Sequence, residues 1–301
     1  MQMSNLVEKI QSLKHQRRAV ILAHNYQLAE VQDIADFTGD SLELSRTAAK
    51  TDAEVIVFCG VHFMAETAKI LSPKKTVLIP DPKAGCPMAD MINAQELREF
   101  KALHPGLPVV AYVNTSAEVK AESTICCTSA NAVRIVESID SDTVLFVPDK
   151  SLGAYVASKT NKRVISYCGY CPTHHRILAQ DVLRVKKEHP GAVVVAHPEC
   201  TMDVLKLADA IESTSGMLRY VAASNAREFI MCTERGLLHR LQKDNPDKVF
   251  YNPSPLNICP NMKKITLEKV LWSLEDMCFE ITLPDEVIAR AKAAIEGMIA
   301  V

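Results

Sequence analysis

The 301-residue sequence lacks the motifs by which many nucleotide-binding and hydrolytic enzymes are recognised. It has only ten glycines, and none of them forms a G-x-G-x-x-G pattern or a G-x-x-x-x-G-K-S/T pattern. A nicotinamide dehydrogenase and a P-loop enzyme are therefore disfavoured, because both use such loops to approach phosphates. The motifs H-E-x-x-H and G-x-S-x-G are also missing, which disfavours a zincin protease and an α/β-hydrolase.

The sequence also has no large excess of positive or negative charge and no long apolar run. The formal net charge of -2 gives no reason to expect a nucleic-acid or anionic-membrane partner. No apolar run approaches the roughly 18 residues of a membrane span, and the first 18 residues resemble an amphipathic helix rather than a signal peptide. We therefore expect a cytoplasmic protein, in which the ten cysteines are buried apolar residues or ligands rather than a disulfide framework.

One order of elements occurs three times along the chain. Short apolar strands alternate with helical segments, and the first strand of each third begins at Ala19, Val109 and Ala192, about 90 and 83 residues apart. Repeats of this size are domains rather than solenoid turns. Strands are predicted over 19–24, 54–60, 76–80, 108–113, 143–148, 163–167, 192–197 and 248–252. Helices are predicted over 1–18, 28–37, 42–51, 62–71, 130–139, 151–160, 204–211, 267–277 and 284–301, with a further helical stretch after the loop 212–216. The segment 122–129 is predicted to be a loop, and neither a helix nor a strand is predicted for 227–241.

This alternation predicts an α/β protein of three similar doubly wound domains with parallel sheets. We place the domains at residues 1–105, 106–188 and 189–301, with the C-terminal helices packing back on the first. Ligands of doubly wound sheets bind outside the carboxyl ends of the strands. Three such edges facing one another around a pseudo-threefold axis would form one central site.

A Cys-Pro step follows the last strand of each repeat, at Cys86, Cys171 and Cys259. Three thiols that meet at one point would hold a [4Fe–4S] cluster with one iron free of protein sulfur, which is suited to bind a substrate oxygen as a Lewis acid. Any of these cysteines could instead be buried and inert. Cys168 and Cys171 also form a C-x-x-C, a pattern of redox pairs and zinc sites, but Cys168 has no counterpart in the other repeats.

Polar side chains lie at the predicted carboxyl ends of the strands and beside one Cys-Pro step. Histidines there could bind carboxylate or phosphate or transfer protons, and Glu199 could act as a general base. Each of these residues, taken alone, could equally be an ordinary core or surface residue. The set is His24, Tyr26, Tyr112, Asn114, His174, His197 and Glu199.

Three hydroxyl-bearing loops each precede a predicted helix. They contain Ser41, Ser129 and the pair Thr214 and Ser215. Helix N-termini hold anions well, so these hydroxyls are candidates for phosphate or carboxylate binding. Simple N-capping explains them equally well.

The segments HNYQ, GDSLELS, AGCPMADM, AYVNTSAEVKAES, GYCPTHH, AHPEC, STSGM and NPSPLNICPNMKKITLEKV together resemble the quinolinate synthase family over nearly the whole chain. The resemblance implies three α/β domains around one [4Fe–4S] cluster per chain. It implies condensation of iminoaspartate with dihydroxyacetone phosphate to quinolinate, with loss of phosphate and water, in de novo NAD biosynthesis. An enzyme that produces the unstable iminoaspartate is a possible functional partner.

Carried over by motif, the resemblance implies specific residue roles. Cys86, Cys171 and Cys259 would ligate the cluster. Glu199, Tyr26, His197, His24 and His174 would form the catalytic set, with Glu199 as the main proton acceptor. Substrate binding would involve His24, Tyr26, Ser41, Tyr112, Asn114, Ser129, His197, Glu199, Thr214 and Ser215. A C-x-x-C-x-x-C run found in some family members is missing at Cys259, so a thiol switch based on it is not expected.

Two other functions are compatible with the same residues. The same three thiols could serve an iron–sulfur hydro-lyase or redox protein that acts on another small acid. Alternatively, the chain could be a non-enzymatic protein whose apposed domains bind an anion, with incidental cysteines. Activity with dihydroxyacetone phosphate would distinguish quinolinate formation from the hydro-lyase or redox function. The absence of iron would favour the anion-binding protein.

Overall fold

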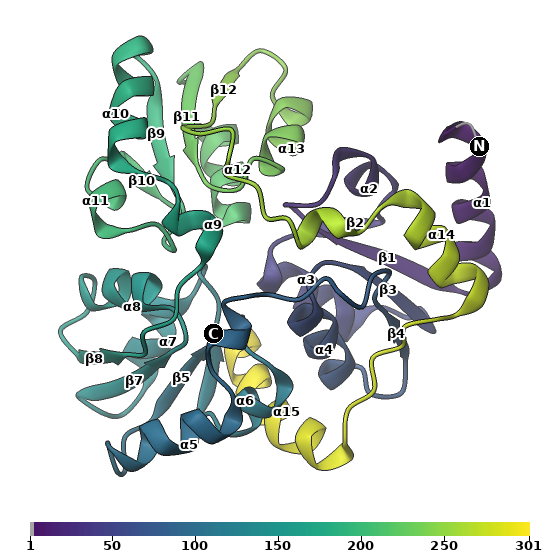
Figure 1. The fold of residues 1–301 in the computed structure, drawn as a ribbon, viewed down its shortest axis with the longest axis horizontal. Helices are drawn as coiled ribbons and strands as arrows, with labels where there is room; N and C mark the ends of the chain where they lie inside the picture. Colours follow the sequence, from purple (N-terminus) through teal and green to yellow (C-terminus); the bar gives the residue numbers. More distant parts are fainter. Residues whose placement is uncertain (1–2) are drawn as a thin grey trace.

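The computed structural model describes residues 3–301 and contains three parallel sheets, as predicted, each with four strands. The strand orders are β2-β1-β3-β4, β6-β5-β7-β8 and β10-β9-β11-β12, so the topology is the same in each sheet. Each sheet with its helices forms one unit, and the three units lie around a common centre (Figure 1). The predicted α/β class with three similar domains is confirmed.

The three units have the same succession of elements. The first contains α1 (Met3–Gln16), β1 (Ala19–His24), α2 (Ala29–Ile34), β2 (Phe37–Gly39), α3 (Ser41–Lys50), β3 (Val55–Cys59), α4 (His62–Leu71) and β4 (Thr76–Leu78). The second contains α5 (Ala94–Ala102), β5 (Val109–Tyr112), α6 (Ala117–Ala121), β6 (Ile125–Cys127), α7 (Ala132–Ser138), β7 (Thr143–Val147), α8 (Lys150–Ala157) and β8 (Arg163–Ser166). The third contains α10 (Ala179–Glu188), β9 (Val193–Ala196), α11 (Met202–Leu205), β10 (Ala210–Ile211), α12 (Thr214–Ala223), β11 (Glu228–Cys232), α13 (Leu237–Asp244) and β12 (Val249–Tyr251).

Short helices and two longer ones complete the chain. A short helix follows each Cys-Pro step, and the two longer helices come last. They are η1 (Ala89–Met91), α9 (Pro172–His175), η2 (Met262–Lys264), α14 (Leu267–Asp276) and α15 (Asp285–Ala300). Within residues 3–301, none of the helices combines the length and apolar character that crossing a membrane requires.

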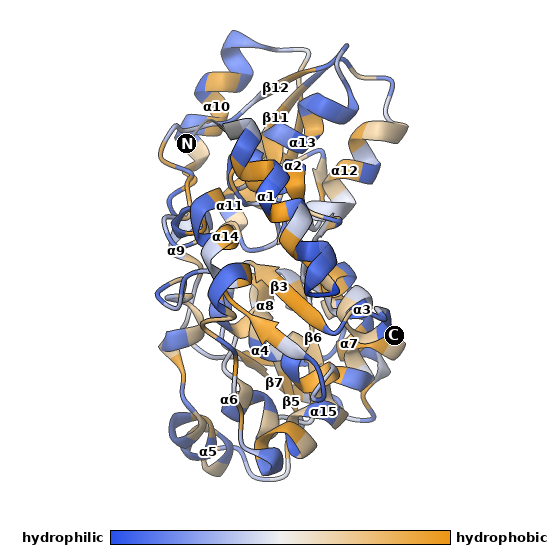
Figure 2. Ribbon diagram, turned by 90° about the vertical axis from the view of Figure 1, so that its right-hand side faces the viewer, coloured by the Kyte–Doolittle hydropathy of each residue, from blue (hydrophilic) through white to orange (hydrophobic). Residues whose placement is uncertain are grey.

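The central strands are apolar without interruption because both faces of each sheet are covered. All five residues of β3 are buried, and this strand is orange along its length in Figure 2, whereas helices such as α13 carry blue, hydrophilic surface. Parallel sheets covered on both faces have this continuous pattern, which is why the sequence predicts every inner strand except β11.

Three short edge strands were not predicted. β6 lies in the segment predicted as a loop, and β2 lies at the junction of a predicted helix and a turn. The predicted helix 204–211 is wrong, because the chain forms α11 and then β10, which pairs in parallel with β9. The unassigned segment 227–241 contains β11 and most of α13.

The packing of the helices between the sheets bears on the domain boundaries. α5 packs on the second unit, where Phe100 meets Tyr167 edge to face with ring centroids 5.6 Å apart. α10 packs against β11 and α11 of the third unit. These contacts favour boundaries one helix earlier than residues 105 and 188, after the Cys86 and Cys171 loops, and we propose those boundaries.

The two C-terminal helices contact different units. α14 packs on α1 and β3 of the first unit. α15 packs mainly on α6 and β6 of the second unit, and also on α4 and α3 of the first. The expectation that both helices pack on the first unit therefore needs correction for α15, which joins the first two units.

Candidate active site

The three sheets direct the loops at their carboxyl ends into one pocket between the units. The first strand of each unit supplies two pocket residues, separated by one position. They are His24 and Tyr26 at and after the end of β1, Tyr112 and Asn114 at and after the end of β5, and His197 and Glu199 after β9. The last strand of each unit leads to the loop with Cys86, Cys171 or Cys259, and all three cysteines line the same pocket.

Nearly every residue predicted for the site lines this pocket. The predicted residues found there are His24, Tyr26, Ser41, Cys86, Tyr112, Asn114, Ser129, Cys171, His174, His197, Glu199, Thr214 and Cys259. Ser215 is not among the lining residues. Its hydroxyl instead accepts the backbone N–H of Asp40 at 3.1 Å and hydrogen-bonds to Glu43, so Ser215 joins the third unit to the first.

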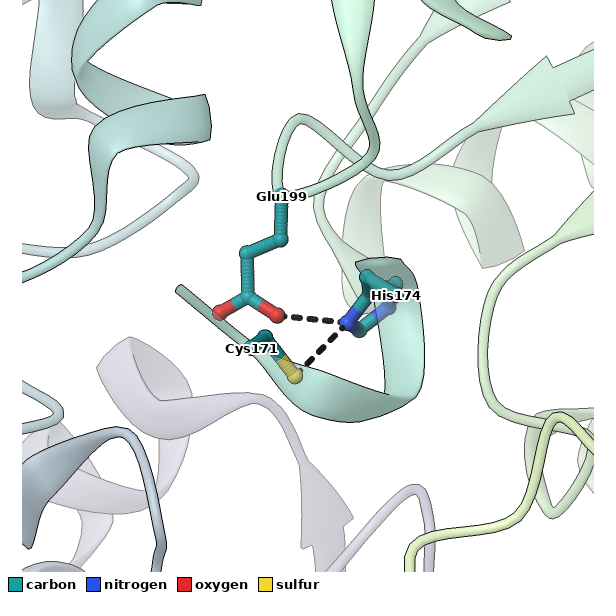
Figure 3. Close-up of side chains that lie close together, drawn as sticks. All are labelled: Cys171, His174 and Glu199. Atoms are coloured by element: carbon teal, nitrogen blue, oxygen red, sulfur yellow. Dashed lines mark hydrogen bonds and ion pairs between the residues drawn. The ribbon is translucent and has the colours of Figure 1, made fainter. Parts of the chain in front are cut away.

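Glu199 is the buried centre of the polar network. Tyr112 donates its hydroxyl to one carboxylate oxygen at 2.6 Å, and Nδ1 of His174 lies 2.6 Å from the other (Figure 3). Burial alone would raise the pKa of the Glu199 carboxyl, but His174 and these hydrogen bonds hold that pKa well below its usual range. Glu199 is therefore a carboxylate at neutral pH.

His24 and His197 are neutral hydrogen-bond donors to the pocket. In each, Nδ1 accepts a backbone N–H two residues further on, that of Tyr26 at 3.1 Å and that of Glu199 at 3.3 Å. The proton of each neutral ring is thus assigned to Nε2. Burial lowers the pKa of both imidazoles to about 3, so neither ring is charged near neutral pH.

A chain of hydrogen bonds links Tyr26 to Glu199. The Tyr26 hydroxyl lies 2.5 Å from Oγ1 of Thr233, which lies 3.0 Å from Nε2 of His174. If Nδ1 of His174 donates to Glu199, then Nε2 accepts from Thr233, and Thr233 accepts from Tyr26. All members are buried, so a proton can pass between the tyrosine and the carboxylate without contact with bulk water.

The two tyrosines keep their protons in this environment. Burial and the nearby charge of Glu199 raise the pKa of Tyr26 and of Tyr112 well above the usual value. Each is consequently a neutral proton donor at physiological pH. Asn114 adds an amide whose buried Oδ1 has no hydrogen-bond partner within residues 3–301 and is free to accept from a ligand.

The predicted anion-binding hydroxyls stand at or near helix starts, but they are not the caps. Asp40 caps α3 and Ser213 caps α12, which leaves the pocket residues Ser41 and Thr214 in the first helical position. Asn131 occupies the cap position of α7, two residues after Ser129. Capping therefore does not account for these three hydroxyls.

The three pocket thiols fit a metal group. None of the ten cysteines in the described residues forms a disulfide. Burial raises the pKa of Cys86 to about 12 and also raises the pKa of Cys171 and Cys259. Thiolates would exist here only beside a strong positive charge, which a bound metal supplies. Cys168 is exposed and does not line the pocket.

One smaller group of donors overlaps this candidate metal site. Ligand atoms of Cys171, His174 and Glu199 lie within 4.8 Å of one another, with Nδ1 of His174 3.2 Å from Sγ of Cys171 (Figure 3). Since His174 and Glu199 are already paired, we regard them as neighbours of the metal site rather than as its ligands.

Several residues of the site were not predicted. Thr233 and Glu234 directly follow β11, and both are completely buried. Glu234 lines the pocket, whereas Thr233 belongs to the hydrogen-bond chain between Tyr26 and His174. Their signal was the same as for the other site residues, a polar pair after an apolar strand, but β11 itself was not recognised. The remaining unpredicted lining residues are Asp40, Val61, Phe63, Met64, Met88, Thr128, Thr173 and Met262.

Known proteins of one family are similar to this chain over nearly its whole length. The family model described as quinolinate synthetase A protein matches residues 8–300. A quinolinate synthase of Dehalococcoides mccartyi (strain CBDB1) is 60% identical over 293 residues, which cover 97% of each chain. Quinolinate synthase 1 of Methanosarcina acetivorans is 58% identical over 301 residues, covering 100% of this chain and 99% of the relative. A quinolinate synthase of Thermodesulfovibrio yellowstonii is 54% identical over 294 residues, covering 97% of each. The chain belongs to the quinolinate synthase family.

Proposed function

We propose that this protein condenses iminoaspartate with dihydroxyacetone phosphate to form quinolinate, releasing phosphate and water, as a step of de novo NAD biosynthesis. One observation carries the proposal: the chain from Tyr26 through Thr233 and His174 to Glu199 opens on the same pocket as three thiols from three units. The reaction requires proton removal, proton return and polarisation of oxygen, and this pocket brings groups suited to all three together.

The proposed cofactor is one [4Fe–4S] cluster per chain, held by Cys86, Cys171 and Cys259. A cluster with three protein thiols keeps one iron open, and that iron would polarise a substrate oxygen as a Lewis acid. The three free thiols at one pocket support this assignment.

Glu199 and Tyr26 are proposed to move the protons. Glu199 is ionised and buried, so it can accept the proton from the carbon that is enolised. His174, which is paired with Glu199, stabilises the charge of this carboxylate. The Tyr26 hydroxyl, still protonated, can return a proton to the departing oxygen and be reprotonated through Thr233 and His174.

Substrate binding is assigned to the neutral donors and the helix starts. Nε2–H of His24 and of His197 can donate to the carboxylates of the diacid without adding a net charge. Asn114 offers both an amide donor and a free acceptor. The first residues of α3 and α12, together with Ser129, are proposed to hold the phosphate or a carboxylate.

We further propose a cytoplasmic location, which the free thiols support because a reducing compartment preserves them. Iminoaspartate is unstable in water, so hand-over from the enzyme that produces it would favour turnover. The proposed partners are thus small molecules and one supplying enzyme.

Anaerobic turnover assays test the function. Protein isolated anaerobically is supplied with dihydroxyacetone phosphate and iminoaspartate generated in place, and quinolinate is measured by chromatography. The parent should form quinolinate, and Glu199→Gln should lower the rate at least about 100-fold, the usual scale for loss of a general base. Iron content should be the same in both proteins.

Three outcomes would contradict parts of this proposal. Normal turnover by Glu199→Gln would exclude this residue as the base. A parent that contains iron but does not consume dihydroxyacetone phosphate would favour a hydro-lyase or redox protein. An iron-free, inactive parent would favour a protein that only binds an anion.

A further inference from the structure

Glu234 is a buried carboxylate beside the proposed cluster ligand Cys259. It follows β11 in the third unit, is 0% exposed, and lines the pocket. One carboxylate oxygen accepts the backbone N–H of Cys259 at 3.0 Å, and the other accepts the backbone N–H of Gly236 at 2.6 Å. The Cys259 loop is therefore tied by its backbone to the end of a sheet strand.

Lys263 connects this carboxylate to the first unit. Its ammonium lies 3.0 Å from Oε1 of Glu234 and also donates to the backbone carbonyl of Tyr26. Tyr26 belongs to the loop after β1, whereas Lys263 stands in η2, directly behind the Cys259 loop. One ion pair thus joins the loop of a proposed cluster ligand to the loop of the proposed proton donor.

The junction is tightly packed at the Cα of Gly236. A Cβ atom on Gly236 would lie 2.6 Å from the Lys263 ammonium, 2.7 Å from a Glu234 oxygen and 2.8 Å from the Tyr26 carbonyl oxygen. Three groups from two units therefore converge where only a hydrogen atom fits. In a close-packed arrangement, displacement of one group must displace the others.

We propose that Glu234 and Lys263 are positioning residues that fix Cys259 and Tyr26 relative to each other. Glu234 holds the backbone of the thiol loop, and Lys263 transmits that placement to the tyrosine across the boundary between the third and first units. The catalytic part of this inference rests on the proposed function, since it takes Tyr26 as a proton donor. The positioning itself is measured by iron retention and by hydrogen exchange of the segment 24–28. Neither measurement requires quinolinate formation.

The test compares Glu234→Gln and Lys263→Met with a matched control. The control is Lys243→Met, because Lys243 also bridges the third unit to the first, pairing with Asp33 at 2.6 Å, but does so at the surface. Three quantities are measured: the anaerobic rate of iron loss to a chelator, hydrogen exchange of the segment 24–28, and kcat and KM for quinolinate formation.

Glu234→Gln should lose iron about tenfold faster than the parent, the lower end of effects seen when a residue supporting a metal ligand is changed. Lys263→Met should increase exchange in the segment 24–28 at least about tenfold and lower kcat about tenfold, with KM within about twofold. Lys243→Met should match the parent in all three measurements.

Iron retention in Glu234→Gln equal to that of the parent, or unchanged exchange in Lys263→Met, would overturn the inference. If a single variant fails to fold, the double variant Glu234→Gln/Lys263→Met removes both charges together, and parental iron retention in that protein would overturn it equally. If the parent itself forms no quinolinate, the proposed function fails, whereas iron loss and exchange still decide the positioning role.

Discussion

At the residue scale, the site depends on charges that are either suppressed or paired. His24 and His197 are buried and neutral, while Glu199 keeps its charge because His174 and Tyr112 face it. This arrangement separates the roles of similar side chains. Two imidazoles serve as fixed donors, and a third is placed where it can exchange a proton with the carboxylate.

The low pKa values of His24 and His197 predict that the stability of the protein depends on pH. In the unfolded chain a histidine takes up its proton near pH 6.5, whereas His24 and His197 resist protonation until about pH 3 when folded. Between these values the unfolded state binds more protons, so the free energy of unfolding falls as the pH falls. From about pH 5.5 to about pH 4.5 each histidine should account for a loss of about 1.3 kcal/mol.

Urea unfolding of the metal-free protein at these two pH values, beside the variant His24→Gln/His197→Gln, measures this contribution. The variant should lose about 2.5 kcal/mol less than the parent on acidification. Asp40 and Asp149, whose pKa values burial raises, act in the opposite direction in both proteins and cancel in the comparison. Equal losses in parent and variant would show that the two rings protonate normally in the fold.

The site residues that sequence reasoning found fall into two groups. Most follow a strand that could be recognised by its apolar residues, as with Glu199 after β9 or Tyr112 at the end of β5. Ser41, Ser129 and Thr214 were found instead from hydroxyl-bearing loops before predicted helices. Thr233 and Glu234 were missed because β11 was not recognised. Ser215 was predicted beside Thr214 but does not line the pocket, because its hydroxyl bonds to Asp40 and Glu43 of the first unit, a contact between units that the sequence does not reveal.

At the element scale, the N-cap side chains of two helices hydrogen-bond to each other across a boundary between units. Asp40 caps α3 through the N–H groups of Leu42 and Glu43, and its second oxygen accepts the hydroxyl of Ser213 at 3.0 Å. Ser213 in turn caps α12 by accepting the N–H of Gly216. The first unit and the third unit therefore share one network of capping hydrogen bonds.

This shared cap predicts non-additive stability effects. Asp40→Ala should destabilise the protein by about 2 kcal/mol and Ser213→Ala by about 1 kcal/mol, the range for losing buried caps. The double variant should lose at least about 0.5 kcal/mol less than the sum, because both single changes remove the same hydrogen bond. Urea unfolding of the four proteins measures the coupling, and strict additivity would mean that the two caps act independently.

The edge strands that the sequence did not predict are short, whereas β11 and α13 were missed because the segment 227–241 had no predicted element. β2, β6 and β10 have two or three residues each, too few to show a period of hydrophobicity. The segment around β10 also has helical spacing of apolar residues, so only pairing with β9 decides its conformation. Longer strands buried on both faces, such as β3, could be predicted because composition alone identifies them.

At the scale of the whole molecule, residues of all three units line the pocket. Each unit contributes one thiol loop, and no unit contributes two of the pocket thiols. A group that binds all three thiols would also tie the three units together, since binding to the folded state alone adds to its stability.

Iron and acid-labile sulfide measured per chain in anaerobically prepared protein test this arrangement. The parent should contain about four of each, as a [4Fe–4S] cluster requires. Both should collapse in Cys86→Ala, Cys171→Ala and Cys259→Ala. Cys168→Ala is the control, because Cys168 is exposed and outside the pocket, and it should keep the parental content.

Retention of iron after loss of any one of the three pocket thiols would contradict the three-thiol site. Loss of iron in Cys168→Ala would instead favour a centre built on the C-x-x-C pair.

The repeated placement of the site residues also bears on how such an enzyme could arise. The same two positions at or just after the end of the first strand hold His24 and Tyr26 in one unit, Tyr112 and Asn114 in the next, and His197 and Glu199 in the last. Three identical copies of an ancestral unit, assembled as a ring with threefold rotational symmetry, would already present three thiols and three pairs of polar residues to one centre. Fusion of the three genes would then have freed each copy to specialise, and a symmetric metal-binding trimer could become a pocket that distinguishes the ends of an asymmetric substrate.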